Sequence, residues 1–100
     1  MIQTKVIFRY WQEEVIAIFP EEIGDPNHST CNSYMTIGQH GACNPSVIIH
    51  NSRPATTEEH RCLENELTIY CGYNLKIVRR HRQSHVQKRK NRLKTFAENN

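Results

Sequence analysis

The chain of 100 residues lacks the features that place many proteins in a functional class at first sight. It has no apolar run near the roughly 20 residues of a membrane-spanning helix, and residues 1–8 lack the basic segment and long apolar stretch of a secretory signal. It also lacks a nucleotide-binding fingerprint, a phosphate-cradling glycine loop, a paired-carboxylate pattern and an internal repeat. We therefore expect a cytoplasmic protein that is not bound to a membrane, uses no cofactor and is not an enzyme.

Apolar residues are also scarce. They make up 37% of the chain, which is low for a globular domain and favours a thin core with a polar extension. Four cysteines could form two disulfides, but without an export signal free thiols in a reducing compartment are the simpler expectation.

What the chain has in excess is positive charge in one region. Residues 1–78 hold five basic and nine acidic residues, a net charge of −4, whereas residues 79–100 hold eight basic residues and one acidic residue, a net charge of +7. Such an asymmetry predicts a basic segment that meets something anionic. We place a single domain at residues 1–80 and a basic tail, flexible or marginally helical, at residues 81–100.

Alternating apolar residues predict a β-hairpin over residues 5–19. β-Branched and aromatic residues dominate both halves, and Pro20 favours the end of the second strand. The turn at residues 12–14 lacks the Asn-Gly or Asp-Gly pair of tight hairpins, so this prediction rests on the flanking segments. Further short strands are predicted at residues 33–37, 46–50 and 73–78, and residues 38–45 are expected to connect the first two of these.

Residues 54–74 contain the clearest helix signal. Thr56 and Glu59 fit a capping box, and Gly72 suits the left-handed position that follows a helix. His60 is expected to face the solvent or the edge of the helix. An apolar stripe at helical spacing comprises Leu63, Leu67, Tyr70 and Cys71. The order β-β-β-β-α-β predicts an α+β fold, in which one helix packs on one face of a small, mostly antiparallel sheet.

Five blocks of sequence resemble, in order, a family of short uncharacterised proteins from phages and mobile elements of gut Bacteroidales. The blocks are KVIFR, VIAIFPEE, SYMTIGQHGA, RPATTEEHRCLENEL and GYNLKIVRR, which span residues 5–80. The resemblance implies an accessory protein of a phage or mobile element that works in the cytoplasm of the bacterial host, and it carries no known activity. The basic tail lies beyond these blocks, so the family implies nothing about its role.

The block SYMTIGQHGA holds the first candidate site. Gly38 and Gly41 permit tight backbone turns, and a loop between strands would present Gln39 and His40, whose imidazole titrates near neutral pH. With Tyr34 added, these residues predict a small site for a ligand or a host protein, made of Tyr34, Gly38, Gln39 and His40. The alternative is a tight connection whose glycines serve only the turn and whose histidine is solvated.

Two His-x2-Cys pairs raise two further hypotheses. A zinc ion needs four nitrogen or sulfur ligands, which these pairs could supply, but two loop histidines and two small, half-buried thiols are the simpler explanation. Alternatively, Cys43 could be the nucleophile of a cysteine hydrolase, with His40 as its base and Gln39 as an oxyanion donor, but no known catalytic motif accompanies them. The four possible zinc ligands are His28, Cys31, His40 and Cys43.

The basic tail is the strongest functional signal. Its cations favour sequence-independent binding to the phosphates of DNA or RNA, while an acidic host protein and simple solvation are the alternatives. The predicted nucleic-acid-binding residues are Arg79, Arg80, Arg82, Lys88, Arg89, Lys90, Arg92 and Lys94. The sequence thus predicts a non-enzymatic nucleic-acid-binding module, with an inhibitor that binds a host protein or a small ligand at residues 38–43 as the alternative.

Overall fold

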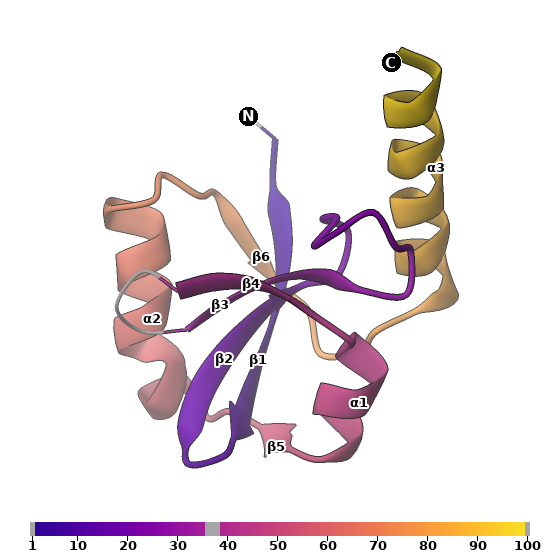
Figure 1. Ribbon diagram of the computed structural model, residues 1–100. Coiled ribbons are helices and arrows are strands. Elements are labelled where there is room, and N and C mark those ends of the chain that lie inside the picture. The colour runs from indigo at the N-terminus through magenta and orange to yellow at the C-terminus, as the bar shows by residue number, and fades with distance from the viewer. Residues whose placement is uncertain (1, 36–38, 100) are drawn as a thin grey trace.

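The α+β fold predicted from the sequence is confirmed by a computed structural model, which describes residues 2–35 and 39–99 (Figure 1). An antiparallel sheet lies at the centre, with helices on both of its faces. The elements along the chain are β1 (Thr4–Trp11), β2 (Glu14–Phe19), β3 (Cys31–Met35), β4 (Gln39–Cys43), α1 (Pro45–His50), β5 (Arg53–Pro54), α2 (Thr57–Ile69), β6 (Leu75–Ile77) and α3 (Gln83–Asn99).

Within the described residues, the strands lie in the order β4-β3-β2-β1-β5, and β6 pairs in parallel with β1. The predicted hairpin is confirmed, with Phe8 opposite Ala17 in the register of β1 and β2. Its two-residue turn places Gln12 and Glu13 at positive φ angles of 51° and 66°. Tight hairpins require this conformation, and here the pairing of the flanking strands imposes it on residues other than glycine or asparagine.

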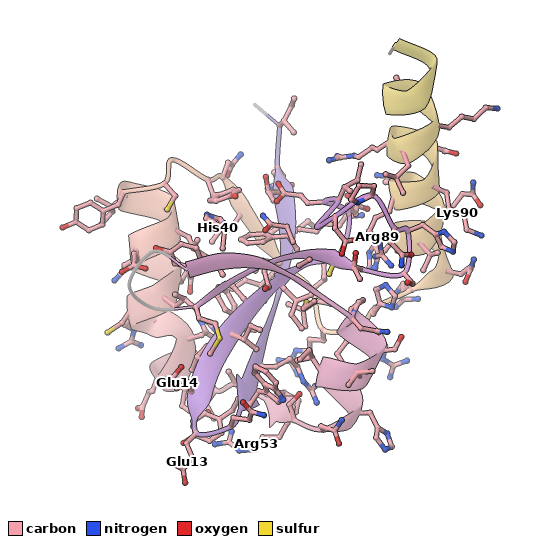
Figure 2. The ribbon with its side chains drawn as sticks, viewed as in Figure 1. Glu13, Glu14, His40, Arg53, Arg89 and Lys90 are labelled. Atoms are coloured by element: carbon pink, nitrogen blue, oxygen red, sulfur yellow. The ribbon has the colours of Figure 1, made fainter. Side chains whose placement is uncertain are left out.

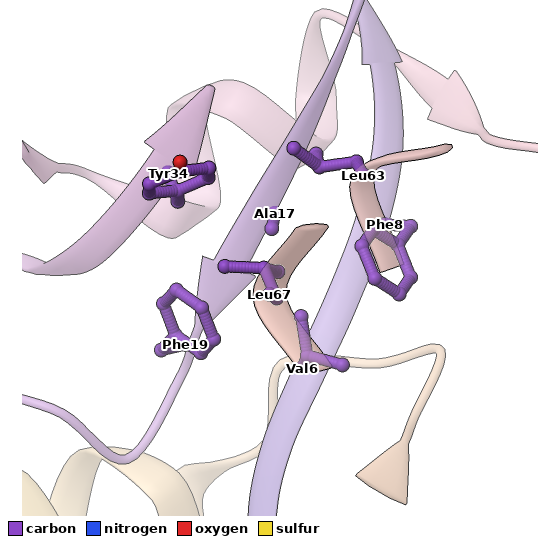
Figure 3. Packing of buried hydrophobic residues seen from close by; sticks show 7 residues of the cluster. All are labelled: Val6, Phe8, Ala17, Phe19, Tyr34, Leu63 and Leu67. Atoms are coloured by element: carbon purple, nitrogen blue, oxygen red, sulfur yellow. The ribbon is translucent and has the colours of Figure 1, made fainter. Parts of the chain in front are cut away.

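Because successive residues of a strand point to opposite faces, the sheet has two apolar layers. One layer packs beneath α2 and contains Phe8, Phe19 and Leu67 (Figure 3). The other contains Ile7, Ile18 and the residues that α1 covers. The helix predicted on one face is therefore present, and α1 and α3 lie on the opposite face (Figure 1).

The strand predicted at residues 46–50 is wrong, because this segment forms α1. The Asn44 side chain caps the helix by accepting hydrogen bonds from the backbone N–H groups of Ser46 and Val47, at 3.1 and 3.3 Å. Pro45 occupies the first helical turn, where its missing N–H costs nothing. These start signals outweigh the strand preference of the β-branched residues, and the fourth strand lies instead at Gln39–Cys43, which we expected to be a connection.

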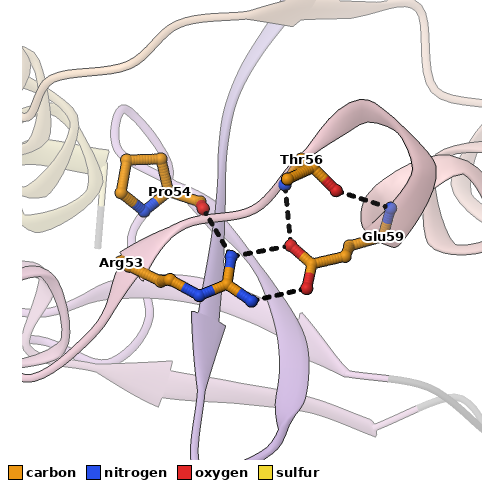
Figure 4. A network of polar contacts seen from close by, with 4 residues as sticks. All are labelled: Arg53, Pro54, Thr56 and Glu59. Atoms are coloured by element: carbon orange, nitrogen blue, oxygen red, sulfur yellow. Dashed lines mark hydrogen bonds and ion pairs between the residues drawn. The ribbon is translucent and has the colours of Figure 1, made fainter.

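The capping box of α2 is confirmed, and Arg53 extends it (Figure 4). The guanidinium donates to both carboxylate oxygens of Glu59, at 2.8 and 2.6 Å, while the Thr56 backbone N–H donates to the same group at 2.9 Å. These contacts, with Arg53 foremost, lower the pKa of Glu59 to about 2. The first turn of α2 is thereby tied to the short strand β5.

The predicted apolar stripe of α2 is only partly correct. Leu63 and Leu67 are buried, but the helix ends at Ile69, so Tyr70 is 84% exposed and Cys71 is exposed as well. Gly72 has a φ of +74° and turns the chain away towards β6, as the sequence predicts. The helix therefore ends two residues before the last residue of the predicted apolar stripe.

His60 is buried, contrary to the expectation that it faces the solvent or the edge of the helix. Its ring stacks on Phe8 with centroids 4.5 Å apart, and its Nδ1 lies 3.1 Å from a carboxylate oxygen of Glu64. The flat His60 ring covers the ring of Phe8 on β1. A pattern that counts only apolar residues does not predict this contact, because histidine is not among them.

Candidate nucleic-acid interface

Three arginines crowd the segment that joins β6 to α3. Arg79, Arg80 and Arg82 are all exposed, and no acidic residue lies between positions 79 and 95. The segment follows the last strand directly, so its cations start from the rigid sheet and not from a free end of the chain. The structure therefore brings these three predicted residues together on one surface.

Two lysines from the sheet join this surface. The parallel pairing of β6 with β1 sets Lys76 beside Lys5 in the register, so the two side chains emerge on the same face of the sheet. A hollow of about 290 Å³ lies against them, and its lining includes Lys5, Lys76, Arg79, Arg80 and Arg82. We call these five residues the basic cluster. Neither lysine is among the predicted binding residues, because only the pairing of distant strands brings Lys5 and Lys76 to the tail.

Two residues of the basic cluster, Arg79 and Arg80, also line neighbouring hollows. A hollow of about 490 Å³ is lined by Arg79, Arg80 and His81, among others, and one of about 390 Å³ also reaches Arg79. Arg79 thus borders all three hollows and Arg80 borders two of them. Cations on the ridges between hollows can reach anionic groups that lie along the surface.

Arg9 faces these hollows too, but its guanidinium is committed to the protein. It donates to Ser52 Oγ at 2.9 Å, to the Ser52 carbonyl at 2.7 Å and to the Ile49 carbonyl at 3.0 Å. These bonds satisfy a carbonyl at the end of α1 and fix the connection to β5. Arg9 is therefore a supporting residue of this surface and not one of its free cations.

Glu21 lies between Lys5 of the basic cluster and Lys88 of α3, and its negative charge partly neutralises both lysines. One of its oxygens, Oε2, lies 3.2 Å from Lys5 Nζ and 3.3 Å from Lys88 Nζ. Burial raises the pKa of Glu21, but the hydrogen bonds from the two lysines outweigh that effect and hold its pKa below the usual value. Lys88, one of the predicted binding residues, is therefore an ion-pair partner that ties α3 to the end of β2.

Arg89 does not belong to the interface, although the sequence analysis assigned it there. Its side chain is 1% exposed and points from α3 into the body of the protein, whereas Lys90 points outward (Figure 2). Its guanidinium donates to the carbonyl oxygens of Pro20 and His28 and to His81 Nε2. A buried guanidinium with these partners is a structural anchor, and it is not available to bind a phosphate.

The helix α3 is docked through one stripe on the loop that follows β2. His85 and Arg89, four residues apart, are both buried, and Leu93 follows at the same spacing. The His85 ring accepts a hydrogen bond from the Arg82 backbone N–H at 3.0 Å. This bond satisfies a free backbone donor at the start of α3, which begins at Gln83. The remaining predicted cations of this helix are exposed, namely Lys90, Arg92 and Lys94.

His81 is the titratable group most perturbed by this docking. Burial lowers its pKa to about 4, and the charge of Arg89 and the neighbouring His85 contribute in the same direction. Because Arg89 Nη1 donates to His81 Nε2 at 3.0 Å, the ring accepts there and is neutral at physiological pH.

We therefore expect acid to weaken the docking of α3. Above about pH 6.5 His81 is neutral in both states, whereas between about pH 6.5 and the folded-state value near 4 only the unfolded chain takes up the proton. The free energy of unfolding should fall by about 1–2 kcal/mol across this window, a figure reduced for the partial exposure of the ring. Urea unfolding near pH 7.5 and near pH 5 measures it. His81→Gln retains an acceptor for Arg89, so its stability should change less, and an equal fall in both proteins contradicts the assignment.

Acidic residues gather on the other side of the sheet. The helix α2 carries Glu58, Glu59, Glu64 and Glu66 with Arg61 as its only Lys or Arg, and it lies across the sheet from α3 (Figure 1). Four of the ten acidic residues thus lie on the side of α2, and the basic residues of the tail lie on the side of α3, where Glu21 pairs with Lys88.

The predicted loop site at residues 34–40 is not supported as one surface. Tyr34 is 4% exposed and belongs to the core layer beneath α2, and its ring meets that of His40 in an edge-to-face contact with centroids 4.6 Å apart. Gly38 and the side chain of Gln39 lie outside the described residues. Gly41 lies within β4, with open space where a side chain would begin, so it is not needed for a tight turn. Of this set, His40 is the exposed residue whose side chain the structure describes.

The predicted zinc and hydrolase sites are wrong, because the strands separate their members. Cys31 and Cys43 are register partners on the face covered by α1, whereas His40 contacts Tyr34 on the face covered by α2. The exposed His28 contributes only its backbone carbonyl, to Arg89. Within residues 2–35 and 39–99, no cluster of three or more His, Cys, Asp or Glu side chains is suited to a metal ion.

Comparisons with known proteins give no relative that would assign this surface a function. No family model, curated protein or solved structure matches the chain. Among the described helices, none has both the length and the apolar content needed to cross a membrane.

Proposed function

We propose that this protein is a non-enzymatic nucleic-acid-binding module that holds a phosphate backbone against the basic cluster. The observation that carries the proposal is the meeting of Lys5 and Lys76, from two strands, with Arg79, Arg80 and Arg82 around one hollow. Cations that converge from separate segments create a positive potential that a single solvated tail does not hold in place.

The chemistry of these side chains suits phosphate. Arginine presents a planar fork of N–H donors that fits two phosphate oxygens, and each neutralised phosphate releases condensed counterions. Lys90 and Lys94 lie one helical turn apart on α3 and can extend the contact along a strand. A continuous backbone is a better match for this spread of cations than a single small anion.

The distribution of acids supports the same choice of face. Glutamates on α2 repel a polyanion, so the phosphates approach the side that carries α3. The resemblance to proteins of phages and mobile elements adds a setting to the proposal: an accessory protein that attaches to nucleic acid in the cytoplasm of a bacterial host.

The test is the salt dependence of binding to a short duplex DNA and to a short single-stranded RNA, followed by fluorescence anisotropy. The wild-type affinity should fall linearly with salt on logarithmic axes. The triple variant Arg79→Gln/Arg80→Gln/Arg82→Gln should bind at least tenfold more weakly near 0.1 M salt, with the slope reduced by about two to three units on DNA. Deleting the tail is a poorer test, because α3 is anchored in the body by Arg89.

Two controls make the result specific. Arg61→Gln removes one exposed charge from α2, on the opposite face, and should leave binding unchanged, while Arg80→Gln removes the same charge from the basic cluster and should weaken it. Poly-glutamate serves as an acidic polypeptide without phosphates. Equal losses in the two single variants, or equal affinity for poly-glutamate and nucleic acid, would overturn the proposal, and the second result would indicate an acidic protein partner.

A further inference from the structure

We infer that Cys31 and Cys43 form a thiol–disulfide redox site that a small disulfide such as oxidised glutathione converts reversibly to an intrachain bond. The two residues are register partners on β3 and β4, and their Sγ atoms lie 3.8 Å apart. Paired residues of adjacent antiparallel strands have Cα separations within the range that a disulfide accepts. Closing the bond therefore requires side-chain rotation and no rearrangement of the strands.

The two thiols differ in access, which gives them different roles. Cys31 is completely buried in the layer beneath α1, while Cys43 is partly exposed. Cys43 is therefore the thiol that an external disulfide can reach. Cys31 lies on its buried side, where its sulfur can attack Cys43 Sγ in a second step.

The surroundings favour the same assignment. The hydrogen bond from Cys31 lowers the pKa of Cys43, with smaller contributions from Ser33 and from the positive charge of Arg89, whereas the pKa of Cys31 is raised. A thiolate is the attacking species in thiol–disulfide exchange. The buried guanidinium of Arg89 thus serves the cysteine pair as well as the docking of α3.

The reaction balances in two exchange steps. The Cys43 thiolate attacks one sulfur of oxidised glutathione, forming a mixed disulfide and releasing one glutathione thiolate. Cys31 then gives up its proton and attacks Cys43 Sγ, forming the Cys31–Cys43 bond and releasing the second glutathione. Two protein thiols are oxidised and one glutathione disulfide is reduced to two thiols, with no other oxidant needed.

The other cysteines do not compete for this bond. Cys62 and Cys71 belong to α2 and the turn after it, and both are exposed on the opposite side of the sheet. Replacing both with serine leaves a protein whose only thiols are the proposed pair.

The experiment uses the full chain as Cys62→Ser/Cys71→Ser, equilibrated in glutathione redox buffers and examined by intact mass and thiol titration. We expect the loss of two hydrogen atoms and of both thiols, reversed by added reduced glutathione. The equilibrium constant for forming the bond should be about a hundredfold larger in the native protein than in urea, because the fold already holds the short loop closed. Circular dichroism confirms that each sample is folded.

Single-cysteine variants test the separate roles. Adding Cys31→Ser should leave Cys43 trapped as the glutathione mixed disulfide, whereas adding Cys43→Ser should leave Cys31 unmodified in the native state. The inference is overturned if the two-cysteine protein stays reduced in oxidised glutathione, stops at the mixed disulfide, or forms the bond equally well in urea. None of these outcomes depends on binding to nucleic acid.

Discussion

Replacing Arg89 with methionine should lower the free energy of unfolding by about 3 kcal/mol, because it removes the donor from one buried carbonyl group and from a second, partly buried one. Arg89 donates to the carbonyl oxygens of Pro20 and His28 from the centre of α3, so its loss detaches the helix from the loop that follows β2. Methionine retains much of the side-chain volume, and the effect therefore reports the missing hydrogen bonds more than an empty space. Urea denaturation followed by circular dichroism measures the change.

The neighbouring residue supplies the matched control. Lys90 lies on the same helix but is exposed, so Lys90→Met should change stability by less than about 0.5 kcal/mol. Arg89→Lys keeps the charge but has no planar fork to reach both carbonyls, and it should fall between the wild type and Arg89→Met. In Arg89→Met, amide hydrogen exchange should become faster in α3 than in the wild type, and this increase should be larger than the increase in the sheet. Equal stability of the two methionine variants would show that Arg89 does not anchor the helix.

Replacing Gly24 with alanine should cost about 3 kcal/mol, at the upper end of the usual range for overpacking. An added Cβ would lie 2.5 Å from the Cys31 carbonyl oxygen, 2.7 Å from its carbon and 2.8 Å from the Ala42 Cβ. Two of these three atoms belong to the backbone of a paired strand, which has little freedom to move aside. The loop before β3 therefore needs glycine because of close backbone approach, and thermal or urea unfolding measures the cost.

Gly41 provides the contrasting glycine, because nothing lies within 4 Å of its added Cβ. Gly41→Ala, in β4, should keep the stability of the wild type within about 0.5 kcal/mol. If Gly41→Ala destabilises the protein as much as Gly24→Ala, then loss of glycine flexibility explains both results and the close approach does not.

The parts of the fold that the sequence predicts are those set by local signals. The β1–β2 hairpin follows from alternating β-branched and aromatic residues, and the start of α2 follows from Thr56 and Glu59. The error at α1 is local too, because Asn44 and Pro45 are a helix start that the run of β-branched residues obscures. Here the capping residues decide the local structure and the strand propensity of the following residues does not.

The candidate interface depends on contacts that no local pattern contains. Lys5 joins the basic cluster only because β6 pairs with β1, more than seventy positions away along the chain. Charge counting likewise places Arg89 with the free cations of the tail, since its partners are carbonyl oxygens 61 and 69 residues distant. The sequence thus predicts where the positive charge is, but not which of these cations face the solvent.

If the proposed binding to nucleic acid holds, the distribution of charge across the sheet affects how the protein approaches the polyanion as well as how tightly it binds. Because α2 carries four glutamates and one arginine, whereas residues 79–99 carry eight basic residues and one glutamate, we expect an electric dipole across the sheet. In the field of a polyanion this dipole experiences a torque, which turns the α3 side forward before contact. Fewer collisions then occur in the wrong orientation, so the arrangement of charge acts mainly on the association rate.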